Sequence, residues 1–562
     1  MGKQLPVYRK RASGDALFRA LSALAEKLLL AVLLGSICLF ILWPMICIAL
    51  RSFQDGQGAF TLSQYQTVFR SYGKSMYNSL FVGVFTAFFC TVLSVATALL
   101  LSTTRGWVKA LFMGILLVTM VSPPFVSSLA YIQLYGRRGW ITYRLLGLSW
   151  NPYNRWGVIW MQSISFVPMN AIFLQGILSK LDSGSIRAAR DLGASPAAIL
   201  RHVVLPLIRP GILVTLLLTF IRSLADFGTP TIIGGRFNTI ASDIYLKLIG
   251  YSDLEMSAAM NMFLMIPSVA AFFLYRHMMK QCDKLTAARQ DRQVELKLPL
   301  QRCGILGWVS ITVSLLFFIM MVLQYVCIFL TGFLKLSRGS YSFTLQYWNQ
   351  LMKYNATSLV RSVGYSLIVA VVGSLFAMVF SYYMGRRKVL GRGFFDCLAT
   401  LPIMLPGTCF GIGYILAFNT EPLRLTGTAF IVIANMLFKQ LPSATKLCAA
   451  TLTQIPISQE KAVRDLGGGR WSVLFDVYFP GMKPAFLSCF VHNFSSSMTT
   501  AGAIIFLIDP GRQLAVFRLF DAVYQGEYAI ASLIASCIIV IVLTVETLAY
   551  LITMKAGRRH VS

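Results

Sequence analysis

The strongest constraint on the fold of this chain is a short charged segment that occurs twice. The first copy is Arg187-Ala-Ala-Arg-Asp-Leu-Gly193, followed by Leu205-Pro206. The second copy is Lys461-Ala-Val-Arg-Asp-Leu-Gly467, followed by Phe479-Pro480. Glycine and proline are separated by the same distance in both copies, so the two copies align at one constant offset. So constant a spacing indicates an internal duplication, which predicts two similar halves.

Each copy is predicted to form two short helices that meet at the glycine. Ala188, Ala189 and Leu192 recur at helical spacing, and Gly193 permits the left-handed conformation that ends a helix. Ser195-Pro196 reads as an N-cap followed by a proline at the first helical position, and Gly469 is the weaker cap of the second copy. Such a hairpin suits docking into a groove of a partner protein. The alternative is a solvated connector with a basic face.

The segments around these hairpins are too apolar for a soluble protein. Apolar residues make up 56% of the 562 residues, mean hydropathy is +0.68, and charged residues are only 13%. The formal net charge of +29 would suggest nucleic acid in a soluble chain, but here the cations lie in polar segments between apolar runs. We therefore predict an integral membrane protein with no nucleic-acid partner.

Twelve apolar runs are long enough to cross a bilayer, at about 20 residues per span. The predicted fold is all-α and polytopic, with two pseudo-symmetric lobes of six helices. The predicted spans lie near 28–50, 76–101, 110–134, 157–179, 204–225 and 256–277 in the first lobe, and near 305–333, 360–384, 395–419, 427–446, 484–507 and 530–554 in the second.

The distribution of lysine and arginine predicts the orientation, because such residues are enriched in cytosolic loops. It places both hairpins and both termini in the cytosol. The predicted organisation is a cytosolic N-terminal segment at 1–27, the first lobe at 28–277, a basic cytosolic linker at 278–304, the second lobe at 305–554 and a cytosolic tail at 555–562.

Sites for metals and for catalysis are not evident in the sequence. The eleven cysteines include no CxxC pair, and the four histidines are far apart. Gly73-Lys74-Ser75 lacks the earlier glycine of a P-loop, because position 68 is Val68. We expect no metal site, no bound cofactor and no enzymatic activity in this chain. The glycines Gly407, Gly411 and Gly413 lie in an apolar run and are expected to allow close helix packing.

Polar residues inside the spans are candidates for a translocation path, because ionisable groups at such depth usually face a bundle interior or water. Arg222 and Asp226 lie one helical turn apart at the end of the fifth predicted span. A mutual ion pair that only locks the bundle is the alternative to a role in the path. The equivalent stretch of the second lobe offers hydroxyl groups at Ser495, Ser496, Ser497, Thr499 and Thr500.

The repeated segment resembles the EAA loop of binding-protein-dependent ABC importer permeases, in which Glu-Ala-Ala precedes a glycine and, further on, Leu-Pro. The positions of Arg187 and Lys461 depart from the glutamate of that pattern, and Glu460 stands one place earlier. The resemblance implies that the loops bind ATPase subunits through Arg187, Ala188, Ala189, Arg190, Asp191, Leu192, Gly193, Leu205, Pro206, Glu460, Lys461, Ala462, Arg464, Asp465, Leu466, Gly467 and Pro480.

Two further motifs, Leu224-Ala-Asp-Phe-Gly-Thr-Pro230 and Pro406-Gly-Thr-Cys-Phe-Gly-Ile-Gly-Tyr414, are similar to the ferric-iron branch of these fused permeases. This resemblance implies a bacterial inner-membrane permease that works by alternating access. Its partners would be two copies of a cytosolic ATPase, which bind ATP and Mg, a periplasmic or lipid-anchored binding protein, and membrane lipid. Related permeases carry organophosphates or phosphonates, sugar phosphates or polyamines, so these substrates stay open. An ion-coupled secondary transporter is the rival class, although it should carry several carboxylates at the membrane midplane.

Overall fold

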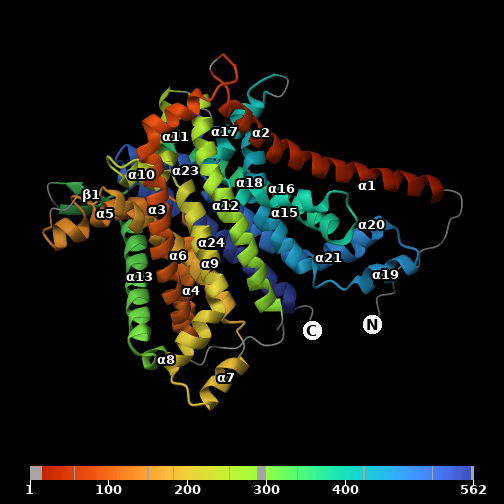
Figure 1. The fold of residues 1–562 in the computed structure, drawn as a ribbon. Helices are drawn as coiled ribbons and strands as arrows, with labels where there is room; N and C mark the ends of the chain where they lie inside the picture. The colour runs from red at the N-terminus through yellow and green to blue at the C-terminus, as the bar shows by residue number, and fades with distance from the viewer. Residues whose placement is uncertain are drawn as a thin grey trace.

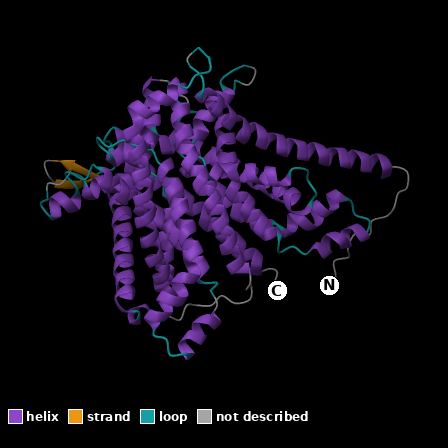
Figure 2. Cartoon of the chain, in the orientation of Figure 1, coloured by secondary structure: helices purple, strands orange, loops and turns teal. Residues whose placement is uncertain are grey.

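The chain is built almost entirely of helices in the computed structural model (Figures 1 and 2). The structure describes residues 15–558, except 56, 149–150, 182, 252, 288–298, 338–339, 422–423 and 509–510. In this part of the chain the strands are β1(Leu334–Ser337) and β2(Ser340–Phe343), which pair antiparallel. The predicted all-α class is therefore confirmed.

The first lobe runs from the N-terminal helix to a long helix that ends beyond the last predicted span. Its helical elements are α1(Asp15–Ile37), η1(Cys38–Leu42), α2(Trp43–Ser52), α3(Ser63–Thr103), α4(Gly106–Val121), α5(Val126–Tyr135), η2(Trp140–Leu145), α6(Arg155–Leu178), α7(Ser183–Asp191), α8(Pro196–Ile199), η3(Leu200–Val204), α9(Leu205–Ala225), α10(Gly228–Ile233), α11(Ile240–Tyr251) and α12(Leu254–Ala287).

The second lobe repeats this order with small changes. Its helical elements are η4(Leu300–Arg302), α13(Gly304–Thr331), α14(Gln346–Tyr354), α15(Ala356–Arg386), α16(Arg392–Thr400), η5(Leu401–Ile403), α17(Gly407–Phe418), α18(Ala429–Leu452), α19(Ile457–Asp465), α20(Arg470–Ser472), η6(Val473–Tyr478), α21(Phe479–Gly481), α22(Lys483–Thr499), α23(Ala515–Tyr524) and α24(Tyr528–Arg558).

Ten of the predicted spans coincide with helical segments that are long and apolar enough to cross a membrane. Eight are single helical stretches, and two more are bent pairs that pass the same test together. The other two predicted spans contain the helices α18 and α22, but α22 ends at Thr499, so the last eight positions of the predicted span 484–507 are not helical. However, α18 carries Lys439 and Lys446 among its apolar residues, and α22 has only 17 residues. The number twelve is consistent with these observations but not confirmed by them.

The third span of each lobe is broken, whereas the sequence predicted continuous spans at 110–134 and 395–419. In the first lobe the axis bends by 108° between α4 and α5, at Pro123 and Pro124. In the second lobe the bend is 114° and lies just before α17, at Pro406. Proline has no amide hydrogen and disfavours helical geometry in the residue before it, so it interrupts a helix.

The predicted connecting segments are partly helical. α12 continues to Ala287, so the first ten positions of the 278–304 linker extend the last helix of the first lobe. α1 begins at Asp15, inside the predicted N-terminal segment 1–27. α24 ends at Arg558, inside the predicted tail 555–562. Residues 1–14, 288–298 and 559–562 lie outside the described residues.

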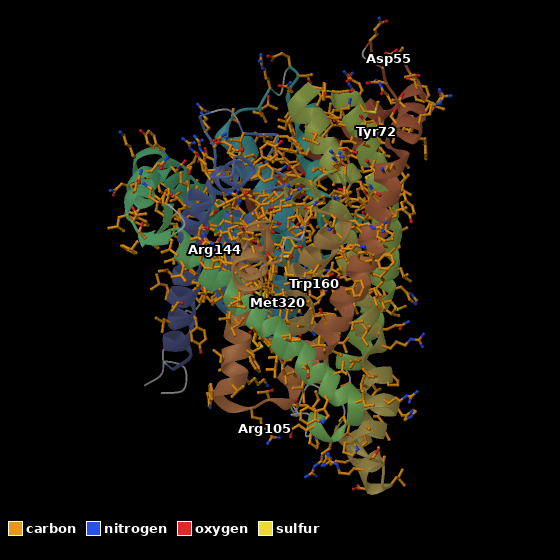
Figure 3. All side chains as sticks on the ribbon, turned by 90° about the vertical axis from the view of Figure 1, so that its left-hand side faces the viewer. Asp55, Tyr72, Arg105, Arg144, Trp160 and Met320 are labelled. Atoms are coloured by element: carbon orange, nitrogen blue, oxygen red, sulfur yellow. The ribbon has the colours of Figure 1, made fainter. Side chains whose placement is uncertain are left out.

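The first span of each lobe packs against the other lobe. α2 packs between α12 of its own lobe and α17 of the second lobe, and these helices meet at the top of Figure 1. In the equivalent way α13 packs against α24 of its own lobe and against α3 and α5 of the first. Figure 3 shows α13, with Met320 labelled, crossing in front of the first lobe. The two lobes therefore exchange their first helices.

Close packing at one of these exchanges depends on glycine. A Cβ atom added to Gly413 of α17 would lie 3.0 Å from Cδ1 of Ile48 and 3.0 Å from both Cβ and the carbonyl oxygen of Pro44, on α2. The absence of a side chain lets the two helices approach each other. This confirms the packing role that the sequence predicted for Gly413.

We therefore expect Gly413→Val to separate α2 from α17 and to destabilise the protein by about 1–3 kcal/mol through overpacking. The apparent melting temperature of the purified protein in detergent should fall by about 3 °C or more. Gly364→Val in α15 is the matched control, because a Cβ atom there would meet nothing within 4 Å. Equal melting temperatures for the two variants would contradict the proposed contact.

Candidate functional site

The first repeated segment forms a hairpin that turns at a glycine. Gly193 has a φ of +83°, a conformation that side chains disfavour. Its amide donates to the carbonyl of Arg190 at 2.9 Å, and the amide of Ala194 donates to the carbonyl of Ala189 at 3.0 Å. These two bonds satisfy carbonyl groups that the end of α7 would otherwise leave unpaired. The predicted left-handed exit is confirmed.

The second repeated segment turns at its own glycine with the same backbone geometry. Gly467 has a φ of +85°. Its amide donates to the carbonyl of Arg464 at 2.9 Å, and the amide of Gly468 donates to the carbonyl of Val463 at 2.8 Å. The backbone hydrogen bonds that close the turn are therefore equivalent in the two hairpins. Figure 1 shows α7 and α8 at the bottom of the molecule and α19 to α21 at the lower right.

The caps of the following helices differ as predicted. The Ser195 hydroxyl accepts a hydrogen bond from the amide of Ala198 at 3.3 Å, and Pro196 occupies the first position of α8. Gly469 precedes α20 with extended backbone and offers no side chain for capping. The first hairpin thus has a side-chain N-cap after its turn, and the second does not.

The tips of both hairpins present apolar side chains outward. Leu192 is 89% exposed and Leu466, its equivalent, is 56% exposed. The other predicted docking residues that are exposed are Arg187, Ala188, Arg190, Asp191, Pro206, Lys461, Ala462, Arg464, Asp465, Gly193, Gly467 and Pro480, while Ala189 and Leu205 are partly buried. Each hairpin thus offers one exposed leucine that a partner's groove could bind.

Glu460 differs from the other predicted docking residues because it lies inside the protein. It is 8% exposed, and its carboxylate lies 3.4 Å from Nε of Arg386 at the end of α15. Arg386 also donates to the carbonyls of Leu452 and Ile455, just before the hairpin. At the equivalent position of the first lobe, Ile186 is buried among apolar side chains. Glu460 therefore anchors its hairpin and does not face outward.

Asp226 is held by neutral partners at the end of the fifth span. Its carboxylate accepts hydrogen bonds from Nε2 of Gln162 at 2.9 Å and from the amide of Thr229 at 3.2 Å. The Gln162 amide oxygen in turn accepts from the hydroxyls of Thr86 at 3.2 Å and Ser223 at 2.5 Å. One buried polar network thus joins α3, α6, α9 and the start of α10.

Arg222 does not pair with Asp226, so the alternative of a mutual ion pair that locks the bundle is wrong. α9 ends at Ala225 and Asp226 has extended backbone, so the one-turn spacing that the prediction assumed is lost. The Arg222 guanidinium instead contacts the Met169 sulfur on α6. Ile221, its neighbour, shares an apolar cluster with Met404 of the second lobe. Arg222 itself contacts α6 of the first lobe, one residue from a side chain of this shared cluster.

The predicted hydroxyl row of the second lobe occupies the equivalent place. α22 ends at Thr499, and Thr500 has the extended backbone of Asp226. Gln440 donates to the Thr500 hydroxyl at 3.0 Å, as Gln162 does to Asp226. The hydroxyls of Thr499 and Thr500 donate to the carbonyls of Ser495 and Ser496 at 3.0 and 2.6 Å. Ser497 is buried, so the row is not a continuous exposed lining.

Lys439 lies inside the predicted span 427–446 and was not among the predicted site residues. Its ammonium group donates to the carbonyls of Pro402 and Leu405 at 2.8 Å each, where the broken span bends. It also lies 5.2 Å from the centre of the Phe410 ring. Its charge within an apolar run was visible in the sequence and could have identified Lys439 as a candidate, because charged residues inside spans are rare.

Aromatic side chains from both lobes meet beside Asp226. The Phe125 and Phe520 rings are 4.8 Å apart, Phe227 and Tyr245 are 5.3 Å apart, and Tyr245 and Phe520 are 5.5 Å apart. Burial raises the pKa of the Tyr245 phenol to about 12, so it stays neutral at physiological pH. This cluster fills the lobe boundary at the end remote from the hairpins.

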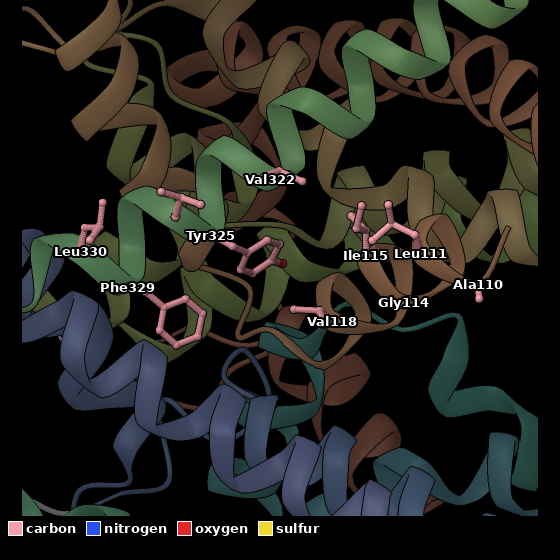
Figure 4. A pocket seen from close by; sticks show the side chains of 10 residues that line it. Ala110, Leu111, Gly114, Ile115, Val118, Val322, Tyr325, Phe329 and Leu330 are labelled. Atoms are coloured by element: carbon pink, nitrogen blue, oxygen red, sulfur yellow. The ribbon is translucent and has the colours of Figure 1, made fainter. Parts of the chain in front are cut away.

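A separate cavity of about 670 Å³ opens between α4 and α13 (Figure 4). Its walls are apolar, and Leu111, Val322 and Leu330 are among the exposed side chains that line it. Such walls match the acyl chains of a bilayer and not a hydrated cargo. Among the described residues, no group of three or more His, Cys, Asp or Glu residues could hold a metal ion.

Comparison with known proteins gives the same duplication. The pattern of the family described as binding-protein-dependent transport system inner membrane component matches residues 91–284 and 368–558. The chain is 29% identical over 547 residues to the ferric transport system permease protein FbpB of Actinobacillus pleuropneumoniae. This alignment covers 92% of this chain and 77% of the relative. It is 30% identical over 519 residues to the putative ferric transport system permease protein FbpB 1 of Haemophilus influenzae, which covers 88% and 80%.

Part of the chain is also similar to a permease named for another substrate. The molybdenum transport system permease protein ModB of Mycobacterium tuberculosis is 31% identical over 183 residues, which are 32% of this chain and 68% of the relative. The family pattern covers well over half of the chain, once in each lobe. The chain therefore belongs to the binding-protein-dependent transport system inner membrane components, as a multi-pass permease with two fused family domains that is related to the ferric transport permeases.

Proposed function

We propose that this chain is the membrane subunit of an ATP-driven importer that carries ferric iron delivered by a binding protein. The observation that supports this most is the pair of hairpins with the same backbone bonds around Gly193 and Gly467. Two equivalent docking elements suit two copies of an ATPase subunit. ATP and Mg would be bound by those subunits, and the relatives with the same domain are transporters and not enzymes.

Coupling would run from the hairpins to the lobe boundary. Closure of the ATPase dimer on ATP would move the two hairpins, and α9 and α22, which follow them, end at the polar layer that contains Asp226 and Thr500. Helices are stiff enough to carry such a displacement, and a two-state arrangement of the lobes would turn it into alternating access. The aromatic cluster of Phe125, Phe227, Tyr245 and Phe520 would close the outer mouth in the state described.

The charges near the boundary suggest how the cargo crosses. Arg222 and Lys439 are cations inside predicted spans, and the nearby carboxylate of Asp226 is already hydrogen-bonded to two groups. A bare ferric ion would be repelled by these cations. We propose that iron passes together with an anionic ligand that Arg222 attracts.

The hairpin role predicts that proline cannot replace the turn glycines. Proline fixes φ near −65°, which conflicts with +83° at Gly193 and +85° at Gly467. In the reconstituted complex, Gly193→Pro or Gly467→Pro should lower receptor-stimulated ATP hydrolysis by about tenfold or more, with the permease still inserted. Gly58→Pro is the matched control, because Gly58 has a φ of +84° in an exposed loop far from the hairpins. Normal stimulated hydrolysis in both hairpin variants would reject the coupling role.

The orientation predicts which side of the membrane each loop occupies. In a cysteine-free background of intact cells, Gln281→Cys at the end of α12 should resist an impermeant thiol reagent. Gln57→Cys, in the exposed loop after the first span, should react readily. Labelling with the opposite pattern would invert the topology.

The path role predicts that the charge of Arg222 is needed for uptake. Arg222→Met should lower uptake of radioactive iron into proteoliposomes by about tenfold or more, while the permease still assembles with its ATPase. Arg209→Met is the control, because Arg209 is exposed on the same helix. Normal uptake by Arg222→Met would reject the role. Uptake of a phosphonate, a sugar phosphate or a polyamine in place of iron would show that the substrate assignment is wrong.

A further inference from the structure

Each hairpin is touched by the exchanged first helix of the opposite lobe. At the first hairpin, the Cys303 thiol at the start of α13 donates to the carbonyl of Pro196, 3.6 Å away. At the second hairpin, the Glu26 carboxylate on α1 lies 2.6 Å from Nη1 of Arg470. Pro196 and Arg470 are equivalent positions, because each stands at the same distance after its turn glycine. The duplication has therefore preserved one contact in both lobes.

The chemistry of this contact differs between the lobes. At the first hairpin it is apolar, because Leu300 and Cys303 are buried in one cluster with Ile199 of α8. At the second hairpin it is ionic. Nε of Arg387, just after α15, lies 3.7 Å from the other carboxylate oxygen of Glu26. One carboxylate thus bridges two cations that belong to separate elements of the second lobe.

Glu26 is well placed to hold these parts together. Its side chain is 12% exposed and that of Arg387 is 18% exposed, so water screens their attraction only weakly. Arg387 is fixed further by the Tyr382 ring, whose centre is 5.4 Å from the guanidinium carbon. If Glu26 lost its charge, the largely buried Arg387 would lack this counter-ion. A buried charge without a partner is costly.

We propose that Glu26 is a positioning residue that links the N-terminal helix, part of the first lobe, to the docking hairpin of the second. Movement of the second hairpin is then passed to the first lobe through α1, α2 and the packing of α2 on α12. In the opposite direction, α13 passes movement of the first hairpin to the second lobe by apolar contact. The inference rests on the proposed docking of ATPase subunits to the hairpins.

The experiment measures iron transported per ATP hydrolysed, using the complete complex in proteoliposomes with its binding protein. Glu26→Gln keeps the shape of the side chain and removes its charge, and Arg470→Gln removes the same pair from its more exposed side. Each should lower the ratio by about threefold or more, and the double variant should be no worse than the worse single variant. Glu26→Asp, which keeps the charge, should recover part of the ratio.

The matched control is Lys335→Gln, which also removes one charged side chain from a polar contact. Lys335 is exposed on β1 and donates to Oε1 of Gln346 at 3.2 Å, outside the hairpins and outside α1, α2 and α12. Its ratio should stay at the wild-type value. A wild-type ratio in both Glu26→Gln and Arg470→Gln, or losses that simply add in the double variant, would overturn the inference. If the wild-type complex shows no ATP-driven iron uptake, the proposed function fails instead.

Raising the salt concentration gives a second readout. The Arg470 side chain is 63% exposed, so salt should weaken the Glu26–Arg470 pair more than the buried Glu26–Arg387 pair. Salt should therefore lower the ratio of the wild type towards that of Arg470→Gln. The same salt should leave the ratio of Arg470→Gln nearly constant, because that variant no longer has the pair. If Glu26 had only a structural role, its replacement would change the melting temperature. The ratios of the wild type and of Arg470→Gln would then depend on salt in the same way.

Discussion

A bilayer offers no hydrogen bonds to an interrupted helix, and this constraint governs the architecture. Every break in a span must be repaired from within the chain. Lys439 donates to two carbonyls where the broken span of the second lobe bends. Asp226 accepts the amide of Thr229 where the fifth span of the first lobe stops and α10 begins. Arg386 donates to carbonyls at the end of α18. Three charged side chains thus supply hydrogen bonds at places where helices stop.

Duplication has preserved backbone geometry more strictly than side-chain chemistry. The turns at Gly193 and Gly467 share their hydrogen bonds, and the fifth spans stop at Asp226 and Thr500, which are equivalent positions. At the same places a carboxylate is exchanged for a hydroxyl, and Ile186 for Glu460. Backbone geometry of this kind is fixed by glycine and proline, whereas many side chains can fill the space around it. The two lobes therefore share backbone geometry at these places but hold it with different side-chain contacts.

Local features could be read from the sequence, and features that depend on distant partners could not. The hairpin turn and the Ser195 cap follow from residues within a few positions of each other. The partner of Asp226 is Gln162, on another helix, and no spacing rule connects them. The ion pair of Glu26 with Arg470 joins residues 444 positions apart. Lys439 is different, because its charge inside an apolar run was visible and only its partners were not.

The exchange of first helices has a consequence for synthesis of the protein. α3 and α5 pack against α13, which leaves the ribosome only after the whole first lobe has been made. Until then, that side of the first lobe meets lipid where it later meets protein. α2 likewise waits for α17. The first lobe therefore cannot reach its final packing during its own translation, so the last steps of folding are an assembly of two halves within one chain. A single polypeptide keeps both halves at high effective concentration during that assembly.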